Sequence, residues 1–135
     1  EVIQVVAGAS HPLTKKRLVK LEDLVSERWI LAPPGTAVND LIFNSFRARG
    51  LPTPELSITT YSMQLRMQLL NSGQYVTALP ISAVRFNAPR WSLKALPITI
   101  GNDLPVSVVT LKARVPTPAV QLFLDQTKLF YASNR

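Results

Sequence analysis

The sequence predicts an α/β fold with mostly parallel strand pairing. Strand-like runs rich in β-branched residues alternate along the chain with segments whose apolar residues repeat at helical spacing. Most of the expected helices lie between consecutive strands, where a crossover helix joins parallel neighbours. With 135 residues, 47% of them hydrophobic and 17% charged, the chain is also long and apolar enough to bury a core.

The first half of the chain supplies the clearest elements. Dense or alternating apolar residues indicate strands, and apolar residues at i, i+3 and i+4 indicate helices. Gly50 is suited to end the longest helix, and Pro52 and Pro54 prevent its continuation. We expect strands over 2–7, 29–31 and 56–60, a short helix over 20–26 and a long helix over 37–49 with Val38, Leu41, Ile42 and Phe46 facing the core.

The second half continues the alternation. The helix expected over 63–72 is apolar on two sides, so we expect it to be buried between layers. Pro97 indicates that its strand is an edge strand or a crossing strand. The expected elements are a helix over 63–72, a strand over 75–79, a helical turn over 82–87, strands over 93–98 and 106–111, and an amphipathic helix over 117–131 with Val120, Phe123, Leu124, Thr127 and Phe130 on one face.

The residues that most enzymes need are missing from the sequence. It holds no cysteine and one histidine, His11, so disulfides and the usual transition-metal sites lack their ligands. Glu22 and Asp23 are adjacent and diverge on a helix, which excludes them as a catalytic carboxylate pair. Motifs for serine hydrolases, dinucleotides and P-loops are absent as well. We therefore expect a binding domain, not an enzyme, without cofactor or metal.

The charge balance adds little about partners. The 15 basic and 8 acidic residues give a formal charge of +7, which favours anions. The basic residues form no stripe, and the one short cluster, Lys15-Lys16-Arg17, fits a solvated loop. Charged residues interrupt every apolar run well before about 18 residues, so we expect no membrane span.

Two segments share a pattern that points to ligand binding. In each, a strand leads through small polar residues into a helix: 29–31 leads to Gly35-Thr36, and 56–60 leads to Ser62. Helix N-termini carry unpaired amides and partial positive charge that hold anions, and ligands of α/β sheets bind beyond the carboxyl ends of strands. Plain helix capping by Thr36 and Ser62 remains an alternative that needs no ligand.

The order of several short motifs resembles the effector-binding domain of LysR-type transcriptional regulators. The resemblance covers nearly the whole chain, although no single motif is specific. It rests on His11-Pro12-Leu13 after a strand, Leu21-x-x-Leu24, Trp29-Ile30-Leu31 leading to Pro34-Gly35-Thr36, Phe46-x-x-x-Gly50, Gly73 followed by Leu79-Pro80, and Phe123-Leu124 in a closing helix. The family commonly has a second glycine where this chain has Tyr75, and a proline where it has Thr53.

The resemblance implies a fold like type II periplasmic binding proteins, in which two crossing strands join two α/β lobes. Residues 29–93 would form one lobe, and residues 1–28 and 94–135 the latter part of the other. Because the sequence begins without Met inside an expected strand, we expect a fragment lacking the first part of lobe I and the N-terminal winged helix-turn-helix. DNA binding would then depend on that absent domain.

The resemblance also implies a small effector, here an organic anion, in the cleft between the lobes. The matching cleft positions are Pro34, Gly35, Thr36, Thr60, Tyr61 and Ser62, and the phenol of Tyr75 is a further candidate. Phe43 lies off the core stripe of its helix and is placed for a contact between subunits of a homo-oligomer. We thus expect a cytoplasmic regulatory domain; the alternative is an extracytoplasmic solute-binding protein for transport.

Overall fold

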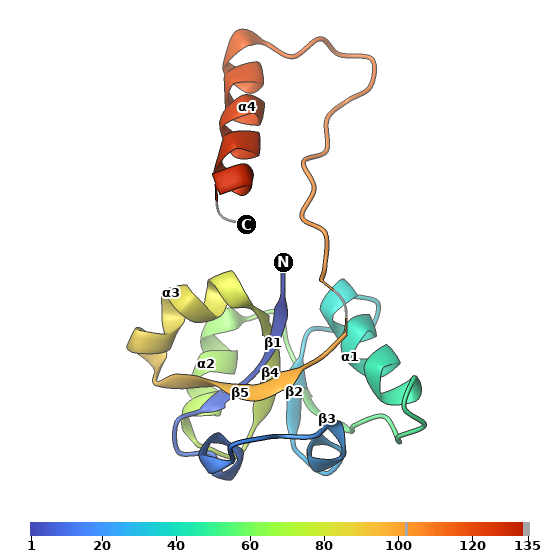
Figure 1. The fold of residues 1–135 in the computed structure, drawn as a ribbon, viewed down its shortest axis with the longest axis vertical. Coiled ribbons are helices and arrows are strands. Elements are labelled where there is room, and N and C mark those ends of the chain that lie inside the picture. Colours follow the sequence, from blue (N-terminus) through green and yellow to red (C-terminus); the bar gives the residue numbers. More distant parts are fainter. Residues whose placement is uncertain (102, 134–135) are drawn as a thin grey trace. The chain divides into compact units, whose positions relative to one another are not determined.

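The computed structural model describes residues 1–101 and 103–133, with backbone alone for residues 87–89. The chain forms two compact units, Glu1–Pro105 and Val106–Arg135. The first unit contains a five-stranded sheet in the order β3-β2-β4-β1-β5 (Figure 1). Its strands are β1 (Ile3–Gly8), β2 (Trp29–Leu31), β3 (Leu56–Thr59), β4 (Val76–Pro80) and β5 (Leu93–Thr99).

The sheet is mixed, whereas the sequence analysis expected mostly parallel pairing. β2 is parallel to β3 and β4, but β1 is antiparallel to both of its neighbours, β4 and β5. The expected alternation of strands and crossover helices fails at β1: the connection from β1 to β2 contains two short 3₁₀ turns instead of a helix, and β1 lies between β4 and β5 and not beside β2. β5, which contains Pro97, is an edge strand as predicted.

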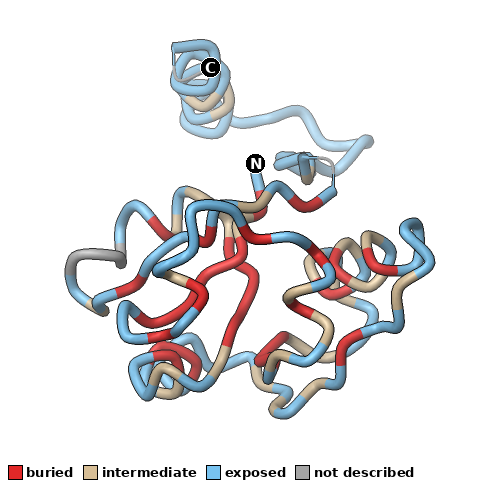
Figure 2. Tube along the Cα trace, turned by 60° about the horizontal axis from the view of Figure 1, so that its bottom comes forward, coloured by how far each residue is buried: buried red, intermediate tan, exposed pale blue. Residues whose placement is uncertain are grey.

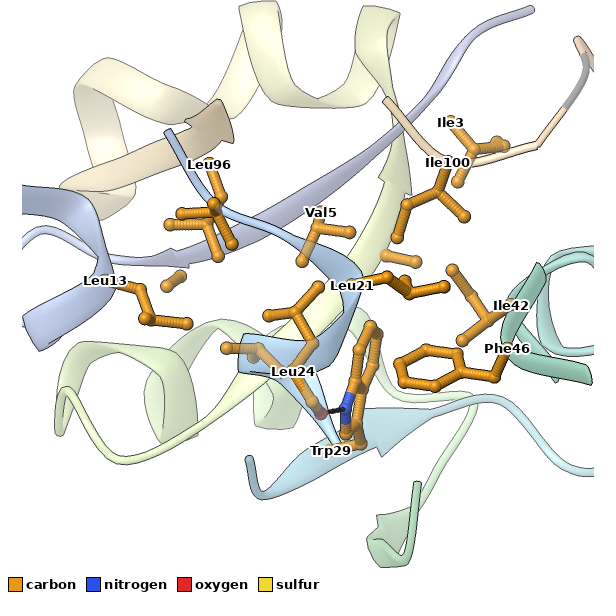
Figure 3. Close-up of a cluster of buried hydrophobic side chains, with 14 of the residues drawn as sticks. Ile3, Val5, Leu13, Leu21, Leu24, Trp29, Ile42, Phe46, Leu96 and Ile100 are labelled. Atoms are coloured by element: carbon orange, nitrogen blue, oxygen red, sulfur yellow. Dashed lines mark hydrogen bonds between the residues drawn. The ribbon is translucent and has the colours of Figure 1, made fainter. Parts of the chain in front are cut away.

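Helices cover both faces of this sheet: α1 (Ala37–Arg47), α2 (Met63–Asn71) and α3 (Ile81–Trp91). The larger core lies under α1, where Ile42 and Phe46 are buried with Trp29 (Figure 3). The rings of Trp29 and Phe46 pack edge to face, with their centroids 6.2 Å apart. The smaller core lies under α2 and α3, around Met67 and Leu70. Buried positions follow the central strands in Figure 2. α1 and α2 therefore lie on opposite faces.

Two helices face the core differently from the expectation. α2 is not buried between layers: it buries Arg66, Met67 and Leu70, while Met63 and Leu65 are 43% and 42% exposed. Its apolar residues lie on two sides of the helix, but the sheet covers only one of these sides. On α1, Asn39 is buried together with Ile42 and Phe46, so the core face is rotated from the predicted stripe, and the flanking Val38 and Leu41 are only partly buried.

The short turns between β1 and β2 close the larger core from its outer side. The first, Pro12–Lys15, begins at His11, whose buried Nδ1 accepts from the Leu13 amide at 3.2 Å and whose Nε2 lies 3.3 Å from Glu27. The second, Leu21–Leu24, replaces the short helix expected over 20–26. His11 is therefore a structural residue.

The second unit contains one helix, α4 (Pro118–Ser133), which confirms the helix expected over 117–131. The strand expected over 106–111 is absent: these residues are extended, unpaired and mostly exposed. A β-branched run becomes a strand only when a neighbouring strand accepts its hydrogen bonds, and none does so here. α4 buries none of its residues, and Phe123 and Phe130 are more than 60% exposed. None of the helices described is long and apolar enough to cross a membrane.

Candidate functional site

The two polar turns that the sequence analysis selected lie at the same edge of the sheet. β2 and β3 are parallel neighbours with Leu31 opposite Thr59, so their carboxyl ends lie together. The Thr60 amide donates to the Leu31 carbonyl at 3.0 Å, which extends the pairing past the end of β3. Since α1 follows β2 and α2 follows β3, both helices start at this edge, which contains Pro34, Gly35, Thr36, Thr60, Tyr61 and Ser62.

The start of α1 has no side-chain cap. Thr36 occupies the N-cap position with extended backbone, but its hydroxyl donates to the Pro33 carbonyl at 3.1 Å instead of accepting from the helix. The backbone amides of residues 37–39 therefore have no hydrogen-bond partner among the described residues. Asn39, which sequence reasoning missed, fixes this turn: its side-chain amide donates to the Ala32 carbonyl at 3.0 Å.

The start of α2 is capped as the sequence predicted. The Ser62 hydroxyl accepts from the Leu65 amide at 3.2 Å, and the Thr60 hydroxyl accepts from the Ser62 amide at 3.0 Å. Within the described chain, the first-turn amides of Met63 and Gln64 remain without a partner. Tyr61 is 74% exposed between these two polar residues. This turn thus offers two free amides, two hydroxyls and an exposed phenol.

Arg66 is a buried, positively charged group of this region, and no sequence pattern indicated it. It is only 7% exposed, and its Nη2 donates to the Thr60 carbonyl at 2.9 Å. Its Nε is buried without a hydrogen-bond partner, and no described carboxylate forms an ion pair with it. Desolvation by burial lowers the pKa of Arg66 from its ordinary value, although a guanidinium remains charged in proteins.

Together these groups form a donor-rich edge. Unpaired backbone amides, the positive ends of two helix dipoles and a buried cation all favour a negative ligand. A carboxylate already occupies the third helix start at this edge, because Glu1 Oε1 accepts from the Ser82 amide of α3 at 3.0 Å. The described residues contain no cluster of His, Asp or Glu that suits a metal ion. The arrangement is suited to holding an anion.

Two other candidates lie elsewhere. Tyr75 immediately precedes β4, at the opposite end of that strand from the candidate site, and Arg28 stacks on its ring with 4.6 Å between the guanidinium carbon and the ring centroid. Its phenol is therefore not part of this edge. The backbone of Tyr75 does not have a positive φ, because Ser92 is the one described non-glycine residue that does, so this position does not require a glycine. Phe43 is half-buried against the larger core of its own chain, whereas the sequence analysis placed it off the core face of α1. The difference arises because the buried face of α1 includes Asn39.

A hollow of about 340 Å³ lies away from these turns, between the second half of α1 and the end of β5. It is lined by Leu21, Leu41, Asn44, Ser45, Ala48, Arg49, Thr99, Ile100 and Gly101. Arg49 is its one charged side chain, and Arg49 itself is exposed. The hollow includes none of the free helix N-terminal amides, so the polar edge is the better candidate.

Comparison with known proteins identifies the family. The LysR substrate binding domain matches residues 1–129. The transcriptional dual regulator GltC of Bacillus subtilis (strain 168) is 26% identical over 133 residues, which are 98% of this chain and 44% of GltC. The chain thus spans less than half the length of this relative.

Solved structures share the fold. The effector binding domain of QuiR in complex with shikimate has a TM-score of 0.72 at 18% identity, covering 99% of this chain and 63% of that one. The BenM effector binding domain with its effector benzoate has a TM-score of 0.54 at 26% identity, covering 73% of this chain and 45% of that one. The chain belongs to the LysR substrate binding domain family, as its motifs had suggested.

Proposed function

We propose that this chain is the sensing part of a LysR-type transcription regulator and that it binds a small organic anion at the edge formed by β2 and β3. Membership in the family makes the chain an effector-binding regulatory domain and not an enzyme. The observation that carries the anion proposal is the pair of helix N-termini at one sheet edge, with free amides in the first turn of each.

The effectors of similar domains support an anion. QuiR was solved with shikimate and BenM with benzoate, and both ligands carry a carboxylate. The site would comprise Pro34, Gly35 and Thr36 on the α1 side and Thr60, Tyr61 and Ser62 on the α2 side. No observation favours the transport alternative, since the curated relative GltC is a transcriptional regulator. Regulation of transcription would place the protein in the cytoplasm.

The larger assembly also belongs to this proposal. Two lobes would enclose the effector. The whole five-stranded sheet would belong to one of them, because β1 pairs with β4 and shares a core with β2 and α1, so the lobe division that the resemblance implied, with residues 29–93 in one lobe and 1–28 and 94–135 in the other, does not fit this sheet. The exposed apolar side chains of α4 support an incomplete lobe, because such surface is ordinarily covered. Effector binding would shift lobe closure and the packing of a homo-oligomer, with Phe43 at its interface, and so act on a separate DNA-binding domain.

The test compares two replacements of Thr36. Thr36→Val removes the hydroxyl at nearly constant shape, while Thr36→Ser keeps it. We expect Thr36→Val to weaken benzoate or shikimate binding by about tenfold in calorimetry, as for loss of a hydrogen bond to a charged ligand. Thr36→Ser should bind like the wild type, and the exposed Thr53→Val controls for a general effect. Equal affinity of Thr36→Val and Thr36→Ser would remove Thr36 from the site.

A further inference from the structure

We infer that Arg66 supplies the counter-charge for the effector and that the effector's anionic group lies at the first turn of α2, not of α1. This inference rests on the proposed function and deepens it, because it assigns an orientation to the ligand. It makes Arg66 the residue that distinguishes an anion from a neutral molecule of the same shape.

The isolation of Arg66 is the first argument. Its side chain is more than nine-tenths buried and makes one hydrogen bond, to the Thr60 carbonyl at 2.9 Å. Its Nε has no partner, and neither described ion pair of the chain includes it. A buried charge without a partner is strongly unfavourable, and a guanidinium offers five donors. The unpartnered Nε and the uncompensated charge therefore favour an anionic ligand.

The position of Arg66 is the second argument. Its guanidinium bonds the carbonyl of Thr60, two residues before Ser62, so the charge lies against the turn that opens α2. The amides of Met63 and Gln64 in that turn have no partner in the described chain. A carboxylate or phosphate accepting from these amides would lie close to the charge of Arg66, and hydrogen bonds to a charged acceptor are stronger than those to a neutral one.

The contrast with α1 gives the orientation. The first turn of α1 contains Asp40, whereas the first turn of α2 contains no acidic residue. Asp40 already compensates the positive end of the α1 dipole and repels a second negative group. The helix dipole of α2 and Arg66 are both positive and repel each other until an anion binds. The α2 turn is thus the more favourable place for the negative group, and α1 would contact the uncharged part.

This arrangement predicts a specific stability pattern. In the absence of ligand, Arg66 is an uncompensated buried charge, so an apolar residue of similar length should be tolerated at this position. In the presence of an anion, the wild-type chain gains stability by mass action, and a variant without the charge gains little. A purely structural Arg66 predicts the reverse: lower stability of the ligand-free variant and unchanged anion binding.

The experiment uses the 135-residue chain with Arg66→Met, Arg66→Lys and the matched control Arg47→Met, which removes the same charge from an exposed site. Each protein is titrated with benzoate, its neutral analogue benzamide and inorganic phosphate, by calorimetry and by the shift in Tm. We expect the wild type and Arg47→Met to prefer benzoate to benzamide, and Arg66→Met to lose at least about tenfold in benzoate affinity. Arg66→Lys should keep part of the preference.

Three results would overturn the inference. Equal benzoate affinity in the wild type and in a folded Arg66→Met would show that Arg66 has only a structural role, while the proposed function would stand. A benzoate affinity lowered equally by Arg47→Met and Arg66→Met would indicate net charge in place of a site. Failure of the wild type to bind either anion would refute the proposed anion site together with this inference.

Discussion

The two helix starts of the site should respond differently when their hydroxyls are removed. Ser62 Oγ accepts from the Leu65 amide, so Ser62→Ala removes a helix cap, which costs about 1 kcal/mol. Thr36 Oγ1 donates to the Pro33 carbonyl and caps nothing, so Thr36→Ala should stay within about 0.5 kcal/mol. If both hydroxyls capped their helices, as the sequence suggested, Ser62→Ala and Thr36→Ala would lower the free energy of unfolding equally.

Urea unfolding followed by tryptophan fluorescence measures this difference. Both tryptophans, Trp29 and Trp91, lie in the unit Glu1–Pro105, so the signal reports the unit that contains both helices. With an m-value of about 2 kcal/mol/M, the midpoint of Ser62→Ala should fall by about 0.5 M and that of Thr36→Ala by much less. Ser62→Asn, which keeps a capping oxygen, is the control and should restore the midpoint. Equal shifts for the two alanine variants would refute the reasoning.

Three further predictions test the fold, its pH dependence and its assembly. Gly8→Ala should lower stability by about 1–3 kcal/mol in thermal unfolding, because the new Cβ would overlap the Leu70 carbonyl of α2. The Lys20 amide and the Lys16 ammonium lower the pKa of Asp23 from its ordinary value, so Asp23→Asn should be less stable than the wild type at neutral pH. The deficit should shrink as the pH falls below the ordinary pKa of an aspartate and vanish once it is below the lowered pKa of the folded state. Phe43→Glu should reduce the mass of a homo-oligomer in light scattering, and an unchanged mass would leave Phe43 as part of its own chain's core.

Local patterns predicted most elements of the first unit. The strand that begins at Trp29 and the alternating strand that ends at Thr59 were placed to within one residue, because side-chain periodicity is a local property. The direction of β1 was not predictable in this way. Its two neighbours, β4 and β5, come from residues about seventy and ninety positions later, and periodicity contains no information about which strand lies beside which.

The segment over 106–111 shows the limit of a strand pattern. Its valines have the composition of a buried strand, yet Val109 is 91% exposed and the segment joins no sheet. A strand differs from a helix in that its backbone hydrogen bonds must be completed by another segment. The sequence indicates only that 106–111 would pair if a suitable edge were present.

The candidate site was predictable where it depends on backbone geometry and unpredictable where it depends on burial. A strand that leads through a small polar residue into a helix places that residue at the helix start, and both Thr36 and Ser62 lie there. The hydroxyl of Thr36 nevertheless takes a different partner, since Pro33 presents a carbonyl within reach of it. The sequence therefore predicted where Thr36 and Ser62 lie, but it did not predict which atom the Thr36 hydroxyl contacts.

Arg66 is a second case in which the position of a residue could be predicted from the sequence but its surroundings could not. Its position on α2, next to Met67 and four residues before Leu70, is on the buried side of that helix. Sequence reasoning treats arginine as a surface residue, because a buried cation is unfavourable unless an anion pairs with it. The folded chain buries Arg66 with one hydrogen bond, to the Thr60 carbonyl, and neither described ion pair includes it, so its burial is unfavourable and other contacts of the fold must offset it. If the proposed site is correct, binding of an anion beside Arg66 would supply the missing counter-charge, and it would therefore stabilise the folded chain more than binding of the same anion to a fully compensated site would.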